Sequence, residues 1–294
     1  MTPATSAPAV GYALASMLII QVGAAVSTSL FATIGPAGAS WLRLAWAAVI
    51  FVAIARPKVW RMRPADLGVA AVLGVVSAGI TLLFFEAVAR LPLATAVAVE
   101  FLGPLAVGLL RPGGRTWPAL AFGGVLLVTQ PWTGTADLVG IAFALGAAAC
   151  WGAYILLTQR VADRFSGLDG LAVSMPAAAL VATFFGAPAA WPHLDWSLLL
   201  VGVGLALLIP VLPYTLELLA LRKLTTSAFG TLMSLEPAFA LVVGAVLLHQ
   251  IPGALQGAGI LLVTLASFGA ARTGSRPAPA APELEVAVSS PRSS

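Results

Sequence analysis

The chain has 294 residues, of which 60% are hydrophobic and 9% charged, and its formal net charge is +4. Soluble domains carry about 45–50% apolar and about 25% charged residues, so a chain this poor in charge cannot keep its surface in water. The composition therefore excludes a soluble enzyme, a nucleic-acid-binding domain and a disordered protein. The single cysteine, Cys150, excludes an internal disulfide.

Ten predominantly apolar segments follow one another along the chain, separated by Gly, Pro and charged residues. They span residues 10–32, 38–55, 66–88, 93–110, 117–131, 136–158, 169–187, 196–219, 225–248 and 253–271. A helix needs about 20 apolar residues to cross a bilayer core about 30 Å thick. The two-residue alternation of a membrane β-barrel is missing from these segments. We therefore predict an all-α membrane protein with ten transmembrane helices, followed by a disordered cytoplasmic tail over residues 272–294.

The positions of the basic residues predict the orientation. Thirteen of the 15 Lys and Arg residues fall in alternate connections or in the tail: Arg56, Lys58, Arg61, Arg63, Arg111, Arg115, Arg160, Arg164, Arg222, Lys223, Arg272, Arg276 and Arg292. The opposite connections hold only Arg90, and Arg43 lies inside a segment. Because cytoplasmic loops carry the excess of Lys and Arg, we predict that both termini are cytoplasmic. The connection over 187–195, which has no Lys or Arg, is then expected outside.

An internal duplication divides the ten segments into two halves. Residues 87–105 read AVARLPLATAVAVEFLGPL and residues 218–238 read LLALRKLTTSAFGTLMSLEPA; an offset of 133 aligns Pro104 with Pro237. Each half has an odd number of helices, so the second half crosses the membrane in the opposite sense. Inverted repeats of this kind are typical of secondary transporters. We predict one five-helix repeat over residues 1–135 and a second over 136–271.

Three stretches resemble a known family: residues 91–105 (LPLATAVAVEFLGPL), 212–221 (LPYTLELLAL) and 229–238 (FGTLMSLEPA). With the order of segments over about 10–270, they are similar to the drug/metabolite transporter superfamily in its EamA-type branch. Within that branch they resemble the threonine/homoserine exporter group. The resemblance implies a ten-helix transporter of the bacterial inner membrane that exports small amino acids. Many members of the group carry a lysine where this chain has Thr28.

Two glutamates lie deep within predicted helices, each close to a proline. Glu100 precedes Pro104, and Glu236 directly precedes Pro237. Proline lacks an N–H and so frees a carbonyl of the preceding turn, and such breaks are tolerated at membrane depth where they line a cavity or contact another helix. One interpretation is a cavity in which these carboxyls bind substrate or protons. The other is a packing kink with a protonated, hydrogen-bonded carboxyl.

A third glutamate shares a helix face with a tyrosine. Tyr214 and Glu217 are three residues apart, so their side chains project from the same side of a helix. A hydroxyl beside a carboxylate is suited to bind a substrate ammonium group. The alternative is that Glu217 forms an ion pair with Arg222 or Lys223 near the cytoplasmic end.

Further polar candidates lie on the first two segments. Arg43 is expected to bind a substrate carboxylate, to reach the outer interface with its long side chain, or to hold the fold together. In the first segment, the sequence offers Gln21 and a cluster of three hydroxyls at Ser27, Thr28 and Ser29. We predict that either helix N-termini or this hydroxyl cluster binds the carboxylate of a substrate.

Two aromatic residues and one charged pair complete the candidates. Trp151 and Tyr154 lie three apart on one segment and offer a cavity wall, although membrane aromatics also serve as packing or interface residues. Glu86 and Arg90, four apart, predict a local salt bridge.

Glycines indicate close helix packing or a dimer face. Gly253 and Gly257 form a GxxxG motif, and Gly123 and Gly124 are adjacent in another segment. Small residues at such positions let helices approach closely.

No metal, nucleotide or catalytic motif is found in the sequence. Its two histidines, His193 and His249, lie apart from each other in predicted outer loops. The nucleotide-binding signature GxxxxGK[ST] is also missing. We therefore expect no cofactor, no metal and no enzymatic activity, and transport driven by an ion or substrate gradient.

We accordingly predict a secondary transporter that exports small metabolites, such as the amino acids threonine or homoserine, across the inner membrane by alternating access. Coupling to protons is included because the deep ionisable groups are carboxylates. The expected partners are the substrate, membrane lipid and protons, without nucleic acid. Whether the chain forms a homodimer stays an open question. One alternative is an importer or exchanger of another metabolite, for example a nucleotide sugar, which needs a basic cavity. Another is an intramembrane lipid-modifying enzyme, which needs a catalytic cluster at one interface.

Overall fold

The computed structural model describes residues 7–109, 116–133, 136–162, 164–165, 168–221, 229 and 232–273, and within this part of the chain every regular element is helical. The longer helices are α1 (Ala7–Ser27), α2 (Phe31–Ala55), α3 (Pro64–Val88), α4 (Leu93–Glu100), α5 (Leu102–Leu109), α6 (Thr116–Thr129), α7 (Leu138–Ala162), α8 (Asp169–Ala190), α9 (Trp196–Ala206), α10 (Leu212–Leu221), α12 (Glu236–Leu247) and α13 (Ala254–Thr273). Short turns join several of them: η2 (Thr28–Leu30), η3 (Val59–Arg61), η4 (Pro131–Thr133), η5 (Trp191–His193) and the π-helical η6 (Leu207–Val211). The prediction of an all-helical chain is confirmed for these residues.

Five helical stretches are long and apolar enough to cross a membrane, judged by length and composition. They are Pro8–Ala55, which includes the junction between α1 and α2, Pro64–Val88, Leu138–Thr158, Asp169–His193 and Trp196–Glu217. Shorter apolar helices cover Leu93–Val107, Ala119–Thr129, Glu236–Leu247 and Ala254–Gly269.

The outer surface carries large apolar side chains. On α8 and α9, Phe184, Trp196 and Leu200 are 74%, 82% and 68% exposed. A soluble monomer rarely exposes apolar area on this scale. Lipid is therefore the solvent that this surface fits.

The junction between the first two predicted segments is a break at Gly35. Inside α2, Gly35 has φ 69° and ψ 169°, and Pro36 follows it. Glycine adopts a positive φ without the steric cost that a Cβ brings, and Pro36 has no N–H for a preceding carbonyl. The chain therefore changes direction here although helical turns continue on both sides.

The predicted helix over 93–110 is not continuous, which corrects the expectation from its apolar pattern. Phe101 forms a turn between α4 and α5. Pro104 cannot donate to the carbonyl of Glu100, and the next amide, of Leu105, lies 3.4 Å from the Phe101 carbonyl oxygen. Proline thus separates the two short helices directly after the glutamate.

The predicted helix over 225–248 is also interrupted. Ser234 and Leu235 form a turn, and α12 begins at Glu236 with Pro237 in its first turn. Proline is favoured at this position because the first amides of a helix have no intrahelical acceptor. Glu236 therefore lies at the start of a helix rather than in its middle, while residues 225–228 and 230–231 lie outside the described residues.

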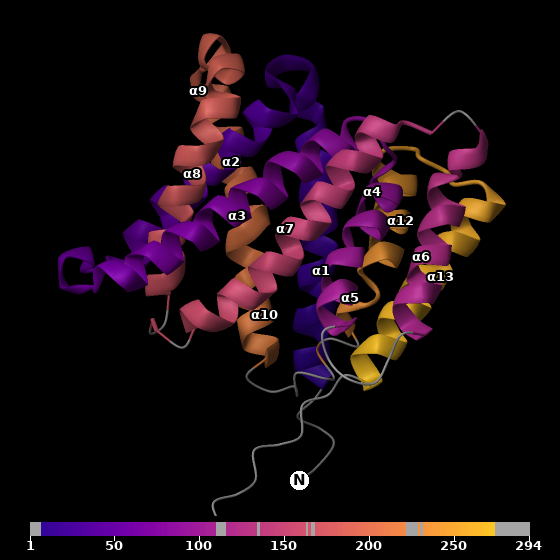
Figure 1. The fold of residues 1–294 in the computed structure, drawn as a ribbon. Coiled ribbons are helices and arrows are strands. Elements are labelled where there is room, and N and C mark those ends of the chain that lie inside the picture. The colour runs from indigo at the N-terminus through magenta and orange to yellow at the C-terminus, as the bar shows by residue number, and fades with distance from the viewer. Residues whose placement is uncertain are drawn as a thin grey trace, which may run out of the picture.

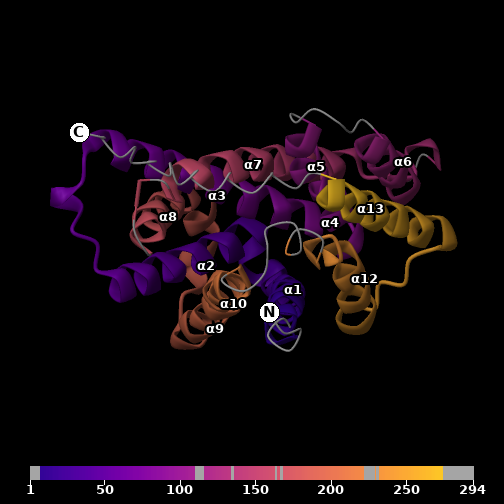
Figure 2. The same cartoon turned by 90° about the horizontal axis from the view of Figure 1, so that it is seen from below.

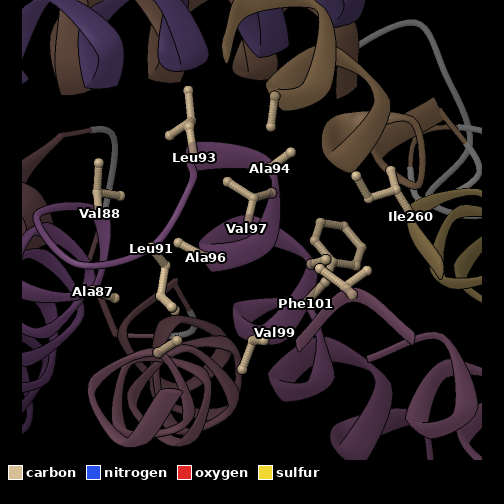
Figure 3. Close-up of a cluster of buried hydrophobic side chains, with 14 of the residues drawn as sticks. Ala87, Val88, Leu91, Leu93, Ala94, Ala96, Val97, Val99, Phe101 and Ile260 are labelled. Carbon is tan, nitrogen blue, oxygen red and sulfur yellow. The ribbon is translucent and has the colours of Figure 1, made fainter. Parts of the chain in front are cut away.

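Helix α4 lies at the centre of the largest buried cluster. All eight of its residues are buried, and Figure 3 shows Val97 and Phe101 beside Ile260 of α13. A helix that is covered on every side can be apolar all round. The single carboxylate of α4, on Glu100, is consequently held inside the protein.

Helix α1 lies between α10 and α12, as the view from below shows (Figure 2). Around it, α2 packs against α8, α3 against α7 and α8, α4 against α7 and α12, and α6 against α13. The beginning of α1 and the end of α13 lie at the same end of the molecule, at the bottom of Figure 1, and η5 lies at the opposite end.

The closest approach of α6 and α13 is at a pair of glycines. A Cβ on Gly124 would lie 2.8 Å from the carbonyl oxygen of Gly259, and a Cβ on Gly259 would lie 2.6 Å from the carbonyl oxygen of Gly124. The two backbones therefore touch without a side chain between them.

The GxxxG motif takes no part in this contact. Gly253 precedes α13, and a Cβ on Gly257 would meet nothing within 4 Å. Its predicted role in packing within the chain is wrong, because these two glycines face away from the neighbouring helices. A role in a dimer face stays a prediction.

We expect Gly259→Ala to destabilise the protein while Gly257→Ala does not. A Cβ at Gly259 would also press on Val128 at 2.7 Å, and overpacking of this kind costs about 1–3 kcal/mol. At Gly257 the Cβ has open space, and alanine gains up to about 1 kcal/mol of helix propensity over glycine.

Thermal unfolding of the two variants in the same detergent checks this pair. Gly257→Ala is the matched control on the same helix. Equal melting temperatures for the two variants would contradict the assigned backbone contact.

Candidate functional site

Three glutamates from three helices lie near one another, and two of them bond to α1. Glu100 ends α4, Glu236 begins α12, and Glu217 lies near the end of α10. Glu100 and Glu236 are only 7% and 6% exposed. Glu236 lies within electrostatic range of both other carboxyls, so the three predicted residues form one acidic cluster.

Glu236 is paired with a glutamine of α1. The Nε2 amide of Gln21 donates a hydrogen bond to Oε1 of Glu236 at 3.2 Å, and the Gln21 side chain is 1% exposed. Among the residues that the structure describes, Oε1 of Gln21 and Oε2 of Glu236 have no hydrogen-bond partner. Sequence reasoning noted Gln21 only as a polar residue of the first segment and missed this pair.

Glu217 is paired with a serine of α1. The Ser16 hydroxyl lies 2.9 Å from Oε1 of Glu217, to which it donates, and 3.4 Å from the carbonyl oxygen of Pro213. Ser16 is fully buried and carried no signal in the sequence. The alternative partners, Arg222 and Lys223, lie outside the described residues, as does the side chain of Tyr214.

Arg43 is buried inside the protein, 7% exposed. Its guanidinium donates to the Thr81 hydroxyl at 2.9 Å and lies over the ring of Phe85, 4.7 Å from the centroid. It is also within electrostatic range of Glu100. The alternative in which Arg43 reaches the outer interface is therefore wrong: α3 supplies both a hydroxyl acceptor and an aromatic face, and these hold the side chain inside.

Trp151 packs against the residue that separates α4 from α5. Its ring and that of Phe101 lie edge to face, with centroids 5.2 Å apart and an interplanar angle of 87°. Trp151 and Tyr154 are both half-buried on α7. The geometry gives Trp151 a packing contact, and a role of either residue in a cavity wall stays a prediction.

The predicted hydroxyl cluster bonds to its own helix. Ser27, Thr28 and Ser29 donate to the backbone carbonyl oxygens of Gly23, Ala25 and Val26 at 2.6, 2.7 and 2.7 Å. Each hydroxyl hydrogen is thus already used within the chain. A substrate carboxylate at Ser27 or Thr28 would have to displace one of these bonds.

The predicted salt bridge between Glu86 and Arg90 does not form. The Arg90 guanidinium lies over the ring of Phe143, 5.7 Å from its centroid. In the described ranges the one ion pair joins Arg164 to Asp66, at 3.1 Å. Arg90, which lies two residues beyond the end of α3, contacts the neighbouring helix α7 instead of Glu86.

An open apolar groove of about 500 Å³ lies away from the carboxylates. It is formed by α8 and η5, and it is lined by Thr183, Phe184, Ala187, Pro188, Trp191 and Pro192. None of the predicted site residues lines it. Within the described part of the chain, no group of three His, Cys, Asp or Glu residues could hold a metal ion.

Comparisons with known proteins agree with this architecture. The model of the EamA-like transporter family matches residues 138–272. The threonine/homoserine exporter RhtA of Salmonella typhimurium (strain LT2) is 40% identical over 268 residues, which cover 88% of this chain and 90% of that protein. The RhtA of Escherichia coli (strain K12) matches with the same identity and coverage.

A solved crystal structure shares the fold. It has a TM-score of 0.59 and 20% sequence identity, and the match covers 91% of this chain and 98% of that one. The expectation from the motifs at residues 91–105, 212–221 and 229–238 is confirmed. The chain is a multi-pass membrane transporter that belongs to the EamA-like transporter family.

Proposed function

We propose that this protein exports a small amino acid of the threonine and homoserine class across the bacterial inner membrane. The observation that carries the proposal is the 40% identity, over 88% of the chain, to threonine/homoserine exporters. The acidic cluster of Glu100, Glu217 and Glu236 supports it, because an amino acid brings an ammonium group that needs a carboxylate inside a membrane.

The substrate ammonium is proposed to bind at Glu217. An unpaired ammonium in an apolar medium is very costly, so a zwitterion must replace its water by protein groups. Glu217 is only partly buried, and its one described partner is the small hydroxyl of Ser16. A carboxylate with a single neutral donor keeps acceptor capacity for a substrate. Tyr214, three residues earlier on α10, is proposed to contribute its hydroxyl.

The substrate carboxylate is proposed to approach Arg43. Among the described residues Arg43 is the only buried basic side chain. The hydroxyls of Ser27 and Thr28 are a second possibility, although their hydrogens are bonded to the helix. Three carboxyls against one guanidinium also disfavour a nucleotide sugar, whose phosphates require a basic cavity.

Two inverted repeats over residues 1–135 and 136–271 are proposed to move against each other in alternating access. The packing partners support this arrangement. Exchanging each helix for its counterpart in the other half converts the α3–α7 contact into α10–α1 and the α5–α7 contact into α12–α1, and all four contacts are present. The same exchange maps the α2–α8 and α6–α13 contacts onto themselves.

The interruptions in the two halves support the same proposal. The offset of 133 that aligns Pro104 with Pro237 also places the turn at Phe101 on the turn at Ser234. Discontinuous helices at equivalent positions surround the substrate site of many transporters with inverted repeats. Ten membrane crossings follow if each half contributes five.

Both termini are proposed to lie in the cytoplasm. The distribution of Lys and Arg supports this orientation. An even number of crossings also agrees with the positions of the start of α1 and the end of α13 at the same end of the molecule (Figure 1).

Export is proposed to be coupled to protons through Glu100 and Glu236. Both carboxyls are buried, and each lies at an interruption: Glu100 ends α4 and Glu236 begins α12. A proton that crosses a potential of 100 mV releases about 2.3 kcal/mol, which corresponds to a substrate gradient of about 50-fold.

We expect Glu217→Gln to weaken the apparent affinity for threonine about ten- to a hundredfold. The loss of one hydrogen bond to a charged group costs about 1.5–3 kcal/mol. Efflux measured against internal threonine, and normalised to the amount of protein in the membrane, checks this expectation. Thr215→Val is the control, since Thr215 is exposed on the same helix and bonds only its own backbone.

Ser16→Ala is expected to have a smaller effect in the same assay, because it removes only a neutral donor to Glu217. A half-saturation for Glu217→Gln that equals the wild-type value would remove this residue from the substrate site. Poor insertion with normal affinity would point to the ion pair with Arg222 or Lys223.

We expect Glu100→Gln or Glu236→Gln to make efflux independent of pH. Glutamine keeps the size and the hydrogen bonds of the side chain but cannot ionise. Efflux from vesicles at a series of internal and external pH values checks this. Wild-type pH dependence in both single variants would show that neither carboxyl carries the proton.

We expect a cysteine at Pro192 to be labelled only from outside the cell. Pro192 is exposed in η5, and the proposed orientation places η5 in an outer loop. An impermeant thiol reagent applied to cells carrying Pro192→Cys in a Cys150→Ser background is the measurement. A cysteine in place of Lys58, in the basic connection before α3, is the matched inner control. Labelling of Pro192→Cys only from the cytoplasmic side would reverse the topology.

A further inference from the structure

Two unsatisfied acceptors belong to one hydrogen-bonded pair. Gln21 Nε2 donates to Glu236 Oε1, and this leaves the amide oxygen of Gln21 and the second carboxyl oxygen of Glu236, Oε2, without a donor among the described residues. Both side chains are more than nine-tenths buried. A buried polar atom without a partner costs about 1–3 kcal/mol, and more when the group is charged.

A single hydrogen would satisfy both oxygens. A carboxylate has acceptors only, whereas a protonated carboxyl also has one O–H donor. When a planar carboxamide and a planar carboxyl lie side by side, the amide N–H meets one carboxyl oxygen. The O–H of the acid then meets the amide oxygen, and an eight-membered ring with two hydrogen bonds closes.

We propose that Gln21 and Glu236 together form a proton-binding site. The proton on Oε2 of Glu236 donates to Oε1 of Gln21, while Nε2 of Gln21 donates to Oε1 of Glu236. The proton comes from water and returns to water, so nothing is oxidised or reduced. When it leaves, Glu236 becomes a carboxylate and Gln21 Oε1 loses its donor.

The charges around Glu236 favour a neutral pair. Glu217 faces it from α10 and Glu100 from α4, and the guanidinium of Arg43 on α2 is within electrostatic range of Glu100. The described side chains of α1 and α13, which also pack against α12, include no ionisable group near it. The neighbouring Glu217 carboxylate therefore opposes a negative charge on Glu236, and only the neutral form of Glu236 can add a second hydrogen bond to Gln21.

A metal cation fits the pair less well than a proton. Hard cations require six or more oxygen ligands, and one of the two Glu236 oxygens already accepts from an N–H of Gln21. The proposed function is needed for one consequence of this inference, namely that the proton crosses the membrane in the direction opposite to the substrate. Proton binding itself can be measured without transport.

Infrared difference spectroscopy of the purified full chain in lipid tests the site. At pH 7 we expect a C=O band of a protonated carboxyl, although a free glutamate, with a pKa of about 4.3, is ionised there. Glu236→Gln should remove this band, whereas Glu217→Gln should leave it. Gln21→Leu should shift its frequency and change the pH at which it is lost, because both hydrogen bonds of the pair are removed. The proposal is overturned if Glu236→Gln removes no such band, or if Gln21→Leu leaves its frequency and pH dependence unchanged.

Thermal unfolding as a function of pH is the second measurement. The folded wild type holds a proton that the unfolded chain releases above pH of about 4.3. The stability that the pair contributes should therefore be lost as the pH rises through release from the folded state. Glu236→Gln places a second amide opposite Gln21 that donates permanently to Oε1, so this part of the pH dependence should disappear. Equal slopes of melting temperature against pH in the two proteins would contradict the shared proton.

The two measurements separate the site from the proposed function. Loss of the infrared band on Glu236→Gln, its shift on Gln21→Leu, and no export of threonine would leave the proton site standing and refute the amino-acid assignment. Export of threonine with neither spectral change would refute the proton site and leave the amino-acid assignment standing. Stabilisation by Na⁺ at constant pH that is lost in Gln21→Leu would overturn the proton in favour of a metal cation.

Discussion

The cost of placing a polar group in an apolar interior governs this structure. With 60% hydrophobic residues and 9% charged ones, the chain has little polar surface to spare, and each buried carboxyl needs a donor or a neighbouring charge. Helix α1 meets this need by lying between α10 and α12, where Ser16 reaches Glu217 and Gln21 reaches Glu236. The interior is therefore organised around one helix whose own side chains are neutral.

The sequence reveals those features whose causes are local. Apolar length predicts the helices, and Pro104 and Pro237 correctly mark the interruptions near Glu100 and Glu236, because proline acts on the turn that contains it. The apolar pattern alone did not show that these helices end there. A continuous hydrophobic run looks the same whether or not one of its turns is lost.

Contacts between distant residues could not be predicted in this way. Ser16 and Glu217 are 201 residues apart, and Gln21 and Glu236 are 215 apart. Their pairing depends on which helices lie side by side, a property of the whole bundle. The glycines show the same limit: the sequence named Gly124 correctly, but on the facing helix its spacing drew attention to Gly257, whereas the close contact is made by Gly259. The sequence likewise allows several positions for the Arg43 side chain, and only the fold shows that it contacts Thr81 and Phe85.

The backbone contact between Gly124 and Gly259 has a consequence for motion. Since the two main chains touch there, α6 and α13 cannot slide or rotate past one another without a clash, and no acyl chain can wedge between them. Helices α6 and α13 therefore behave as one rigid unit at one edge of the bundle. Any rearrangement that opens a pathway must then be absorbed elsewhere, at joints where the helical hydrogen bonds are already interrupted, such as Gly35, Phe101 and Leu235.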